Sequence, residues 1–367
     1  MSYFRFTIAI YIQPCVRRVK RTTFGVMCLL FAVSSYAIPP TFVPADSSTF
    51  EYLGAWQNMT THVATAYAGS QFRFALSGKA CLRFLPPNHG TLRLKIQKDG
   101  NEIWNDVLQT DAIEVDGGEA FSSFSIVYLT SSAMRFDASN PPAASLLQFS
   151  GCNLAHDAGI RAPDKTRNGL SLAFIGDSIT CGTCILGRQG DWSVHSDATR
   201  TYAFRLADAL ESNYLMWGIP GGKASSFSGL FGQALSSPSS RPPDLVFINL
   251  GANQRIHSEA RFREGMRQMA RGILLTYPET HIVLLNFMRM TPDRLPMFKS
   301  LAREFPVGKV STFDARPFLV GYADDGVHPD EESHRRLGTA LAEQVKAHMQ
   351  STGTEINGEN SLPRRHE

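Results

Sequence analysis

Hydrophobic and polar residues alternate along several short runs in the first half of the chain. The runs with this two-residue period are 71–76 (QFRFAL), 91–96 (TLRLKI), 121–129 and 145–149. Alternation of this kind is typical of strands with one buried face, and turns such as KDGN at 98–101 separate the runs. The pattern predicts an all-β domain, a β-sandwich or jelly roll, over residues 44–155.

The second half of the chain changes to alternating apolar runs and amphipathic stretches. We expect buried strands at 172–175, 214–219, 244–250, 281–286 and 309–313, and helices at 199–212, 259–276 and 331–349. This order is typical of a parallel sheet covered by helices, and it predicts an α/β domain over residues 170–350. Polar residues predict a linker at 156–169 and a flexible tail at 351–367.

The N-terminus has the composition of a secretory signal peptide. Basic residues at positions 17, 18, 20 and 21 precede an apolar run at 24–33, and small residues stand at positions 35 and 37. The apolar run is short for a membrane span. We therefore expect a signal peptide over residues 1–37 and a secreted or periplasmic protein without a stable membrane span. The long leader suggests that translation starts near Val16.

The net charge of the chain and the distribution of its basic residues indicate which classes of binding partner to expect. The 367-residue chain has a net charge of +3, and its basic residues are scattered beyond the N-terminus. This distribution gives no indication of a nucleic-acid groove. A hydrophobic content of 43% is enough for one or two substantial cores.

Four cysteines follow the predicted signal peptide: Cys81, Cys152, Cys181 and Cys184. An even number in an exported protein permits disulfides, and a bridge between Cys81 and Cys152 would lie within the β-domain. The pairing stays open at this point. Cys181 and Cys184 form a CxxC without a thioredoxin-like context or a second pair of zinc ligands, so we expect a structural role for them.

The stretch SLAFIGDSITCGTC at 171–184 places a serine where chemistry is usual in an α/β sheet. Ser178 follows a buried strand and a glycine, and the carboxyl end of a strand is where such sheets meet ligands. A capping serine would have the same local pattern. A nucleophilic serine needs an oriented base, and Asp325 and His328, three residues apart, supply both groups. Asn253, after another apolar strand, can offer its amide to an oxyanion.

GDSIT, a glycine turn after the second strand, GAN at 251–253 and DGVHP at 325–329 together resemble the SGNH (GDSL) hydrolases over residues 170–350. The resemblance implies an SGNH-type, flavodoxin-like three-layer α/β/α domain. It implies Ser178 as nucleophile, His328 as base and Asp325 as its orienting acid. It also implies an oxyanion hole formed by Ser178, Gly221 and Asn253. The chain has Gln254 where the family often has Asp, and Gly222 is an alternative to Gly221.

Other polar residues near these motifs have simpler explanations. His334 lies on the last predicted helix, and we expect it to be structural or to face solvent. Asp314 ends a strand, but Asp325 is closer in sequence to His328. Asp324 would point away if Asp325 points inward. Asp177 precedes the serine, and we expect it to brace the turn.

The order of the two domains, and the segment from 51 to 151, resemble the family 2 carbohydrate esterases. Here Ala55 stands where an Arg often follows the Tyr-x-Gly pattern. Aromatic residues of the first domain (Trp56, Trp104 and Tyr128) can stack on sugars or belong to the core. Aromatic residues of the second domain (Trp192, Trp217 and Phe227) can line a pocket or pack.

The resemblance implies a serine esterase that removes O-acetyl or other short acyl groups, with an acetylated polysaccharide or another small acyl ester as substrate. The ester hydrolysis that the resemblance implies requires no metal and no organic cofactor. A general short-chain esterase or lipase and an acyltransferase use the same chemistry. A carbohydrate-binding protein with an inert hydrolase domain is the alternative that is not an enzyme. The natural glycan and the oligomeric state stay open.

Overall fold

The computed structural model describes most of the chain after residue 40. The residues it describes are 41–85, 92–131, 146–165, 167, 169–187, 194–227, 241–254, 259–287 and 293–352. They belong to one compact unit. The predicted signal peptide and Trp192 lie outside them. None of the helices in these ranges is long and apolar enough to cross a membrane.

Two antiparallel sheets occupy residues 41–161. One has the order β3-β4-β11-β6-β9, with β1 also paired to β11; the other has the order β12-β5-β10-β7-β8, with β2 also paired to β5. The strands are β1 (Thr41–Pro44), β2 (Glu51–Leu53), β3 (Gln57–Asn58), β4 (Val63–Thr65), β5 (Gln71–Ser77), β6 (Lys79–Phe84), β7 (Leu92–Lys98), β8 (Asn101–Val107), β9 (Ala112–Asp116), β10 (Ser122–Ser131), β11 (Leu147–Leu154) and β12 (Gly159–Arg161). The last of these lies in the segment expected to be a linker, and it pairs with β5.

Aromatic side chains fill the core of this β-sandwich. The rings of Phe72 and Phe149 come from the two different sheets and stack with their centroids 4.2 Å apart. Trp56 and Tyr128 are each 1% exposed and belong to the same core. They therefore stabilise the domain by burial and offer no surface for stacking on a sugar. Trp104 is half-buried on β8.

The turn at 98–101 joins β7 and β8 as a tight hairpin. Lys98 pairs with Asn101, and the two central residues, Asp99 and Gly100, have φ values of +50° and +81°. Positive φ at both central positions is the mark of a type I′ turn, which Asp-Gly favours. The sequence prediction of a turn here is confirmed.

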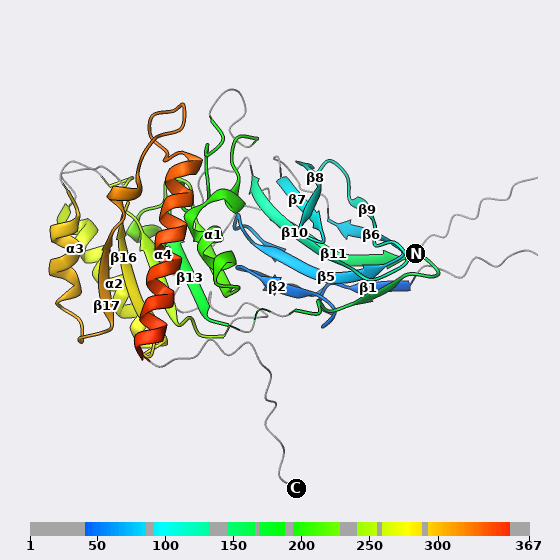
Figure 1. The fold of residues 1–367 in the computed structure, drawn as a ribbon, viewed down its shortest axis with the longest axis horizontal. Coiled ribbons are helices and arrows are strands. Elements are labelled where there is room, and N and C mark those ends of the chain that lie inside the picture. The colour runs from blue at the N-terminus through cyan, green and yellow to red at the C-terminus, as the bar shows by residue number, and fades with distance from the viewer. Residues whose placement is uncertain are drawn as a thin grey trace, which may run out of the picture. The chain divides into compact units, whose positions relative to one another are not determined.

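The second part of the chain forms a five-stranded parallel sheet in the order β14-β13-β15-β16-β17 (Figure 1). Its strands are β13 (Ser171–Gly176), β14 (Asn213–Gly218), β15 (Leu245–Asn249), β16 (His281–Asn286) and β17 (Val310–Asp314), and its helices are α1 (Tyr202–Ala209), α2 (Glu259–Thr276), α3 (Leu295–Ala302) and α4 (Glu331–Thr352). Counted along the chain, the strand order is 2-1-3-4-5, the flavodoxin-like order. The predicted fold class is confirmed.

The two faces of this sheet are covered by different helices. Alternate residues of β13 point to opposite faces, as in any strand. Leu172 and Phe174 pack with α1 and α4, whereas Ala173 and Ile175 pack with α2 and α3. The sheet is thus the middle layer of three, and α1 and α4 lie against each other on one side (Figure 1).

One helix, α3, was not predicted from the sequence. It is absent from the predicted elements because it is short, begins without a side-chain cap bond and carries Pro296 in its first turn.

The four cysteines after the signal peptide are thiols and form no disulfide. Cys81 lies opposite Asn153 and Cys152 lies opposite Leu82, so the two thiols point to opposite faces of their sheet and cannot bridge.

The β-sandwich contacts the edge strand of the parallel sheet. The Gly54 N–H donates to the Tyr214 carbonyl of β14 at 2.8 Å, and the Tyr214 hydroxyl donates to the Gly69 carbonyl at 2.6 Å. Lys95 of β7 donates to Asp197 at 3.1 Å, and both side chains are buried. These contacts hold the β-sandwich against the parallel sheet.

Candidate active site

Ser178 lies in the turn that follows β13. Every residue of β13 is buried, so the strand gives this turn a fixed base. A Cβ at Gly176 would lie 1.9 Å from the Thr180 hydroxyl oxygen, and that hydroxyl is 3.0 Å from the Tyr202 hydroxyl. Only glycine fits there, because the turn folds back onto its own strand. Ser178 is left half-buried at the carboxyl end of the sheet.

The loop between β17 and α4 brings His328 to this serine. The His328 Nε2 lies 2.8 Å from the Ser178 Oγ, and its Nδ1 lies 2.5 Å from the Asp325 Oδ2. A carboxylate only accepts hydrogen bonds, so Nδ1 carries the hydrogen and Nε2 is left to accept the serine hydroxyl hydrogen. The side chains of His328 and Asp325 are 16% and 4% exposed. The three residues form one continuous chain of hydrogen bonds.

Asp325 is held ionised and in one orientation. Burial disfavours its charge, but hydrogen bonds from the His328 ring and from the backbone N–H groups of His328 and Val327 keep the pKa of its carboxyl below the ordinary value. Both backbone bonds reach Oδ1 at 2.9 Å. The other oxygen therefore faces His328, as orientation of an imidazole requires.

Asn253 follows β15, the strand next to β13, and its side chain points toward the same turn. Its Nδ2 donates to the Asp177 Oδ2 and to the Gly222 carbonyl, both at 3.2 Å. The amide thus lies between the neighbour of Ser178 and the neighbour of Gly221. Both of its hydrogens have protein acceptors, but the two bonds are long. A negatively charged oxygen makes a stronger, charge-assisted bond and can take over one hydrogen.

Asp177 does more than brace its own turn. Its Oδ1 accepts the Ile179 N–H at 3.1 Å, as expected from the sequence, and its Oδ2 accepts from Asn253. The side chain is 1% exposed. Burial raises the pKa of Asp177 to about 7, although the bonds from Ile179 and Asn253 oppose the rise. Sequence reasoning missed the contact with Asn253, because only the strand order makes positions 177 and 253 neighbours.

Backbone hydrogen bonds distinguish the two glycines after β14, Gly221 and Gly222, as possible oxyanion donors. The Gly222 N–H donates to the Ile219 carbonyl at 2.8 Å, so it is already used in the turn. Gly221 has a φ of +73°, which favours glycine. Across the described part of the chain, the N–H groups of Gly221 and Ser178 donate to no protein acceptor. Of the two glycines, Gly221 is therefore the one with a backbone donor to offer.

The other polar residues considered from the sequence do not join this site. His334 is buried, and its Nδ1 accepts the Tyr202 N–H at 3.2 Å. Burial lowers the pKa of its imidazole to about 3, so it is neutral and structural. Asp314 pairs with Arg316 at 2.7 Å, and Asp324 is exposed. Trp217 and Phe227 are buried in the core.

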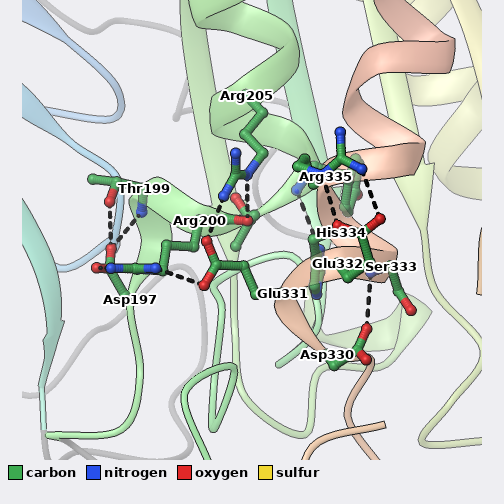
Figure 2. Close-up of polar contacts among 12 residues, drawn as sticks. Asp197, Thr199, Arg200, Arg205, Asp330, Glu331, Glu332, Ser333, His334 and Arg335 are labelled. Carbon is green, nitrogen blue, oxygen red and sulfur yellow. Dashed lines mark hydrogen bonds and ion pairs between the residues drawn. The ribbon is translucent and has the colours of Figure 1, made fainter. Parts of the chain in front are cut away.

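A network of charged residues holds the helix that follows His328. Figure 2 shows Arg200 between Asp197 and Glu331, the first residue of α4. Arg200 contacts Glu331 at 2.5 Å, and Arg205 reaches the same carboxylate at 2.7 Å. Lys95 of the β-sandwich meets Asp197 at the other end. The network ties the start of α4 to α1 and to the first domain.

One group of three side chains in the described residues has the composition of a metal site. Single ligand atoms of Cys184, Asp325 and His328 lie within 4.8 Å of one another. The group includes the histidine and the carboxylate that contact Ser178.

Part of the chain is similar to a known protein family, and its fold is similar to solved structures. Residues 174–336 match the model of the GDSL-like Lipase/Acylhydrolase family. No curated protein sequence matches the chain. A family two carbohydrate esterase from Cellvibrio japonicus has a similar structure, with a TM-score of 0.68 and 15% identity over 84% of this chain and 98% of that one.

Two further solved structures are similar to this chain. An active-site mutant of a family two carbohydrate esterase from Clostridium thermocellum matches with a TM-score of 0.67 and 18% identity over 82% of this chain and 98% of that one. An acetyl xylan esterase from Butyrivibrio proteoclasticus matches with a TM-score of 0.64 and 14% identity over 85% and 99%. The chain is therefore an ester hydrolase with a GDSL-like lipase/acylhydrolase domain at 174–336 and the fold of the family 2 carbohydrate esterases.

Proposed function

We propose that this protein is a secreted serine esterase that removes O-acetyl groups from a polysaccharide through Ser178, His328 and Asp325. The observation that carries the proposal is the unbroken chain of hydrogen bonds from the Asp325 carboxylate through the His328 ring to the Ser178 hydroxyl. A serine hydroxyl is a weak nucleophile, and this chain supplies the base and the orientation that it lacks.

The first half of the reaction forms an acyl-enzyme. The Ser178 Oγ attacks the ester carbonyl carbon while the His328 Nε2 takes the hydroxyl proton. The carbonyl oxygen becomes an oxyanion and accepts hydrogen bonds from the N–H groups of Ser178 and Gly221 and from the Asn253 amide. As the tetrahedral intermediate collapses, the bond to the sugar oxygen breaks, and His328 gives that oxygen its proton.

Water completes the reaction. His328 removes a proton from the water molecule as its oxygen attacks the acetyl carbon. A second oxyanion forms against the same donors. The bond to the Ser178 oxygen then breaks, His328 returns the proton to the serine, and acetate leaves. Asp325 stays ionised throughout and keeps the hydrogen of the imidazole on Nδ1.

The substrate class and the location rest on similarity and on the sequence. Solved structures similar to this chain include a family two carbohydrate esterase and an acetyl xylan esterase, and each match covers both the β-sandwich and the α/β part. The N-terminal pattern favours export, with cleavage after Ala37. We divide the chain into a signal peptide (1–37), a β-domain (44–155), a connecting segment (156–169), the hydrolase domain (170–350) and a tail (351–367).

The test is acetate release from a panel of acetylated xylans, mannans and cello-oligosaccharides, with Ser178→Ala as the matched control. We expect the wild type to release acetate from at least one glycan and Ser178→Ala to release almost none. Equal release by the two proteins would refute the serine assignment. Turnover of p-nitrophenyl esters without glycan deacetylation would favour a general esterase. Acetyl groups recovered on an added acceptor would favour a transferase, and glycan binding without turnover would favour a binding protein.

A further inference from the structure

Cys184 has an unusual backbone conformation close to the proposed active site. It lies in the turn after Ser178, and its φ of +56° falls in the left-handed region that glycine normally occupies. Its N–H donates to the Ser196 hydroxyl oxygen at 3.0 Å, and both residues are buried. A non-glycine residue held there costs conformational energy, which is often retained where the side chain has a use.

The thiol of Cys184 lies beside two of the proposed catalytic groups. Its sulfur, one nitrogen of His328 and one oxygen of Asp325 are all within 4.8 Å of one another. In a tetrahedral zinc site, bonds of about 2.0 to 2.3 Å place neighbouring ligand atoms roughly 3.3 to 3.6 Å apart. The sulfur would therefore need to move by no more than about 1 to 1.5 Å, and the 2.5 Å contact between the His328 Nδ1 and the Asp325 Oδ2 would open by about 1 Å.

We propose that Cys184, Asp325 and His328 form a zinc site and that zinc bound there switches the esterase off. A thiolate, an imidazole and a carboxylate are all ligands that zinc takes, and thiolate disfavours magnesium and calcium. Binding releases the thiol proton to solvent, and the imidazole hydrogen passes through solvent from Nδ1, which binds the ion, to Nε2. The resulting thiolate and the carboxylate together balance the two charges of the ion. The bound ion occupies His328, so the base is lost. Only this loss of activity rests on the proposed function.

The surroundings of the three ligands are suited to holding an ion. The Asp325 Oδ1 accepts two backbone N–H groups, which fixes the carboxylate while its other oxygen faces the site. The Ser178 Oγ lies on the other side of the ring, 2.8 Å from Nε2, so a water molecule fills the fourth position. Ser178 and His328 are partly exposed, which leaves a path of entry.

Cys181 provides a matched control. It is also buried and lies three residues away, but its sulfur is 3.3 Å from the Thr183 hydroxyl oxygen and 3.5 Å from the Ser178 carbonyl. It is not in the three-residue group. Removing its thiol therefore tests for nonspecific effects of losing a cysteine.

The experiment measures binding first and activity second. The full mature chain, freed of metal with EDTA, is titrated with Zn²⁺ by calorimetry and with Co²⁺ by absorption spectroscopy, as wild type, Cys184→Ser, Cys184→Gly and Cys181→Ser. Cys184→Gly suits the backbone conformation and guards against misfolding. We expect one zinc ion per wild-type chain and a cobalt-to-thiolate absorption band. Loss of a direct ligand should weaken binding by about a hundredfold or more in both Cys184 variants, and Cys181→Ser should bind like the wild type.

Activity is then followed against p-nitrophenyl acetate for each protein relative to its own metal-free rate. We expect zinc to inhibit the wild type, EDTA to restore it, and magnesium to have no effect. The proposal is overturned if the wild type binds no zinc, or if the Cys184 variants bind or are inhibited as strongly as the wild type. If the wild type binds zinc through Cys184 but has no esterase activity without metal, the proposed function fails and the site stands.

Discussion

Asp177→Asn should remove a pH-dependent loss of stability and should also lower activity. Asp177 is 1% exposed, and burial raises its pKa from the ordinary value of 3.8 to about 7. Each pH unit of that difference is equivalent to about 1.4 kcal/mol. Ionisation of Asp177 in the folded protein therefore costs about 4 kcal/mol relative to the unfolded chain.

The sign of the pH dependence follows from the two pKa values. Below pH 3.8 the carboxyl is protonated in both states, and its pKa has no effect on stability. Between pH 3.8 and about 7 only the unfolded chain ionises, so the folded state becomes progressively less favoured. Above pH 7 both states are ionised and the cost is constant. Asparagine cannot ionise, so the variant escapes this loss.

We expect the free energy of unfolding of Asp177→Asn, minus that of the wild type, to rise by about 3 to 4 kcal/mol between pH 4 and pH 8. Urea unfolding followed by fluorescence at each pH measures it. Any constant cost of the substitution cancels in this comparison. Asp106→Asn, which removes an exposed carboxylate on β8, is the control and should show no such rise. A difference that does not depend on pH would refute the reasoning.

The same variant should lose activity. Asp177 accepts hydrogen bonds on both oxygens, from Ile179 and from Asn253. An amide at 177 presents one N–H₂ group in place of an acceptor, so Asn253 must turn its oxygen toward it and its own N–H₂ away from the oxyanion. Loss of one such donor lowers kcat by about a hundredfold to a thousandfold. Wild-type kcat in the variant would show that Asp177 does not orient Asn253.

Three further changes test other parts of the site and of the domain contact. Asn253→Ala should fold normally and lower kcat by about a hundredfold or more, and an unchanged kcat would remove Asn253 from the oxyanion hole. Asp325→Asn should lower kcat by roughly a thousandfold or more, because the imidazole hydrogen is no longer held on Nδ1. A pH–rate profile at saturating substrate measures this loss of kcat. Lys95→Met should destabilise the protein by about 2 to 4 kcal/mol, because it leaves a buried carboxylate with one cation fewer. Adding Asp197→Asn should recover part of that loss in urea unfolding, and no recovery would contradict a direct pairing.

Much of the fold could be predicted because hydrophobic periodicity is strong where elements are buried. The helix at 259–276 and the strand at 281–286 have the predicted bounds. Both contain a regular apolar pattern between clear breaks. Prediction was poorer where local signals compete. The residues 199–201 begin a predicted helix, but Asp197 and Thr201 each cap a separate turn there, so α1 begins at Tyr202.

The candidate site was predictable as a set of residues and not as a set of contacts. Ser178, His328 and Asp325 stand in short motifs that sequence alone reveals. The bond from Asn253 to Asp177 and the approach of Cys184 to His328 depend on which loops meet at one edge of the sheet. The sequence does not contain that information locally, since 144 positions separate Cys184 from His328. The sequence left open whether His334 is structural or faces solvent for the same reason: Tyr202 and Phe287, which enclose it, come from other elements.

The central claim is that His328 activates Ser178, and covalent labelling by a fluorophosphonate tests it most directly. The Ser178 oxygen displaces fluoride from phosphorus while its proton passes to His328. Mass spectrometry should find one label per chain, on the peptide that contains Ser178, and none on Ser178→Ala. His328→Ala should be labelled roughly a thousandfold or more slowly. A label on another residue, or equally fast labelling of His328→Ala, would contradict the account.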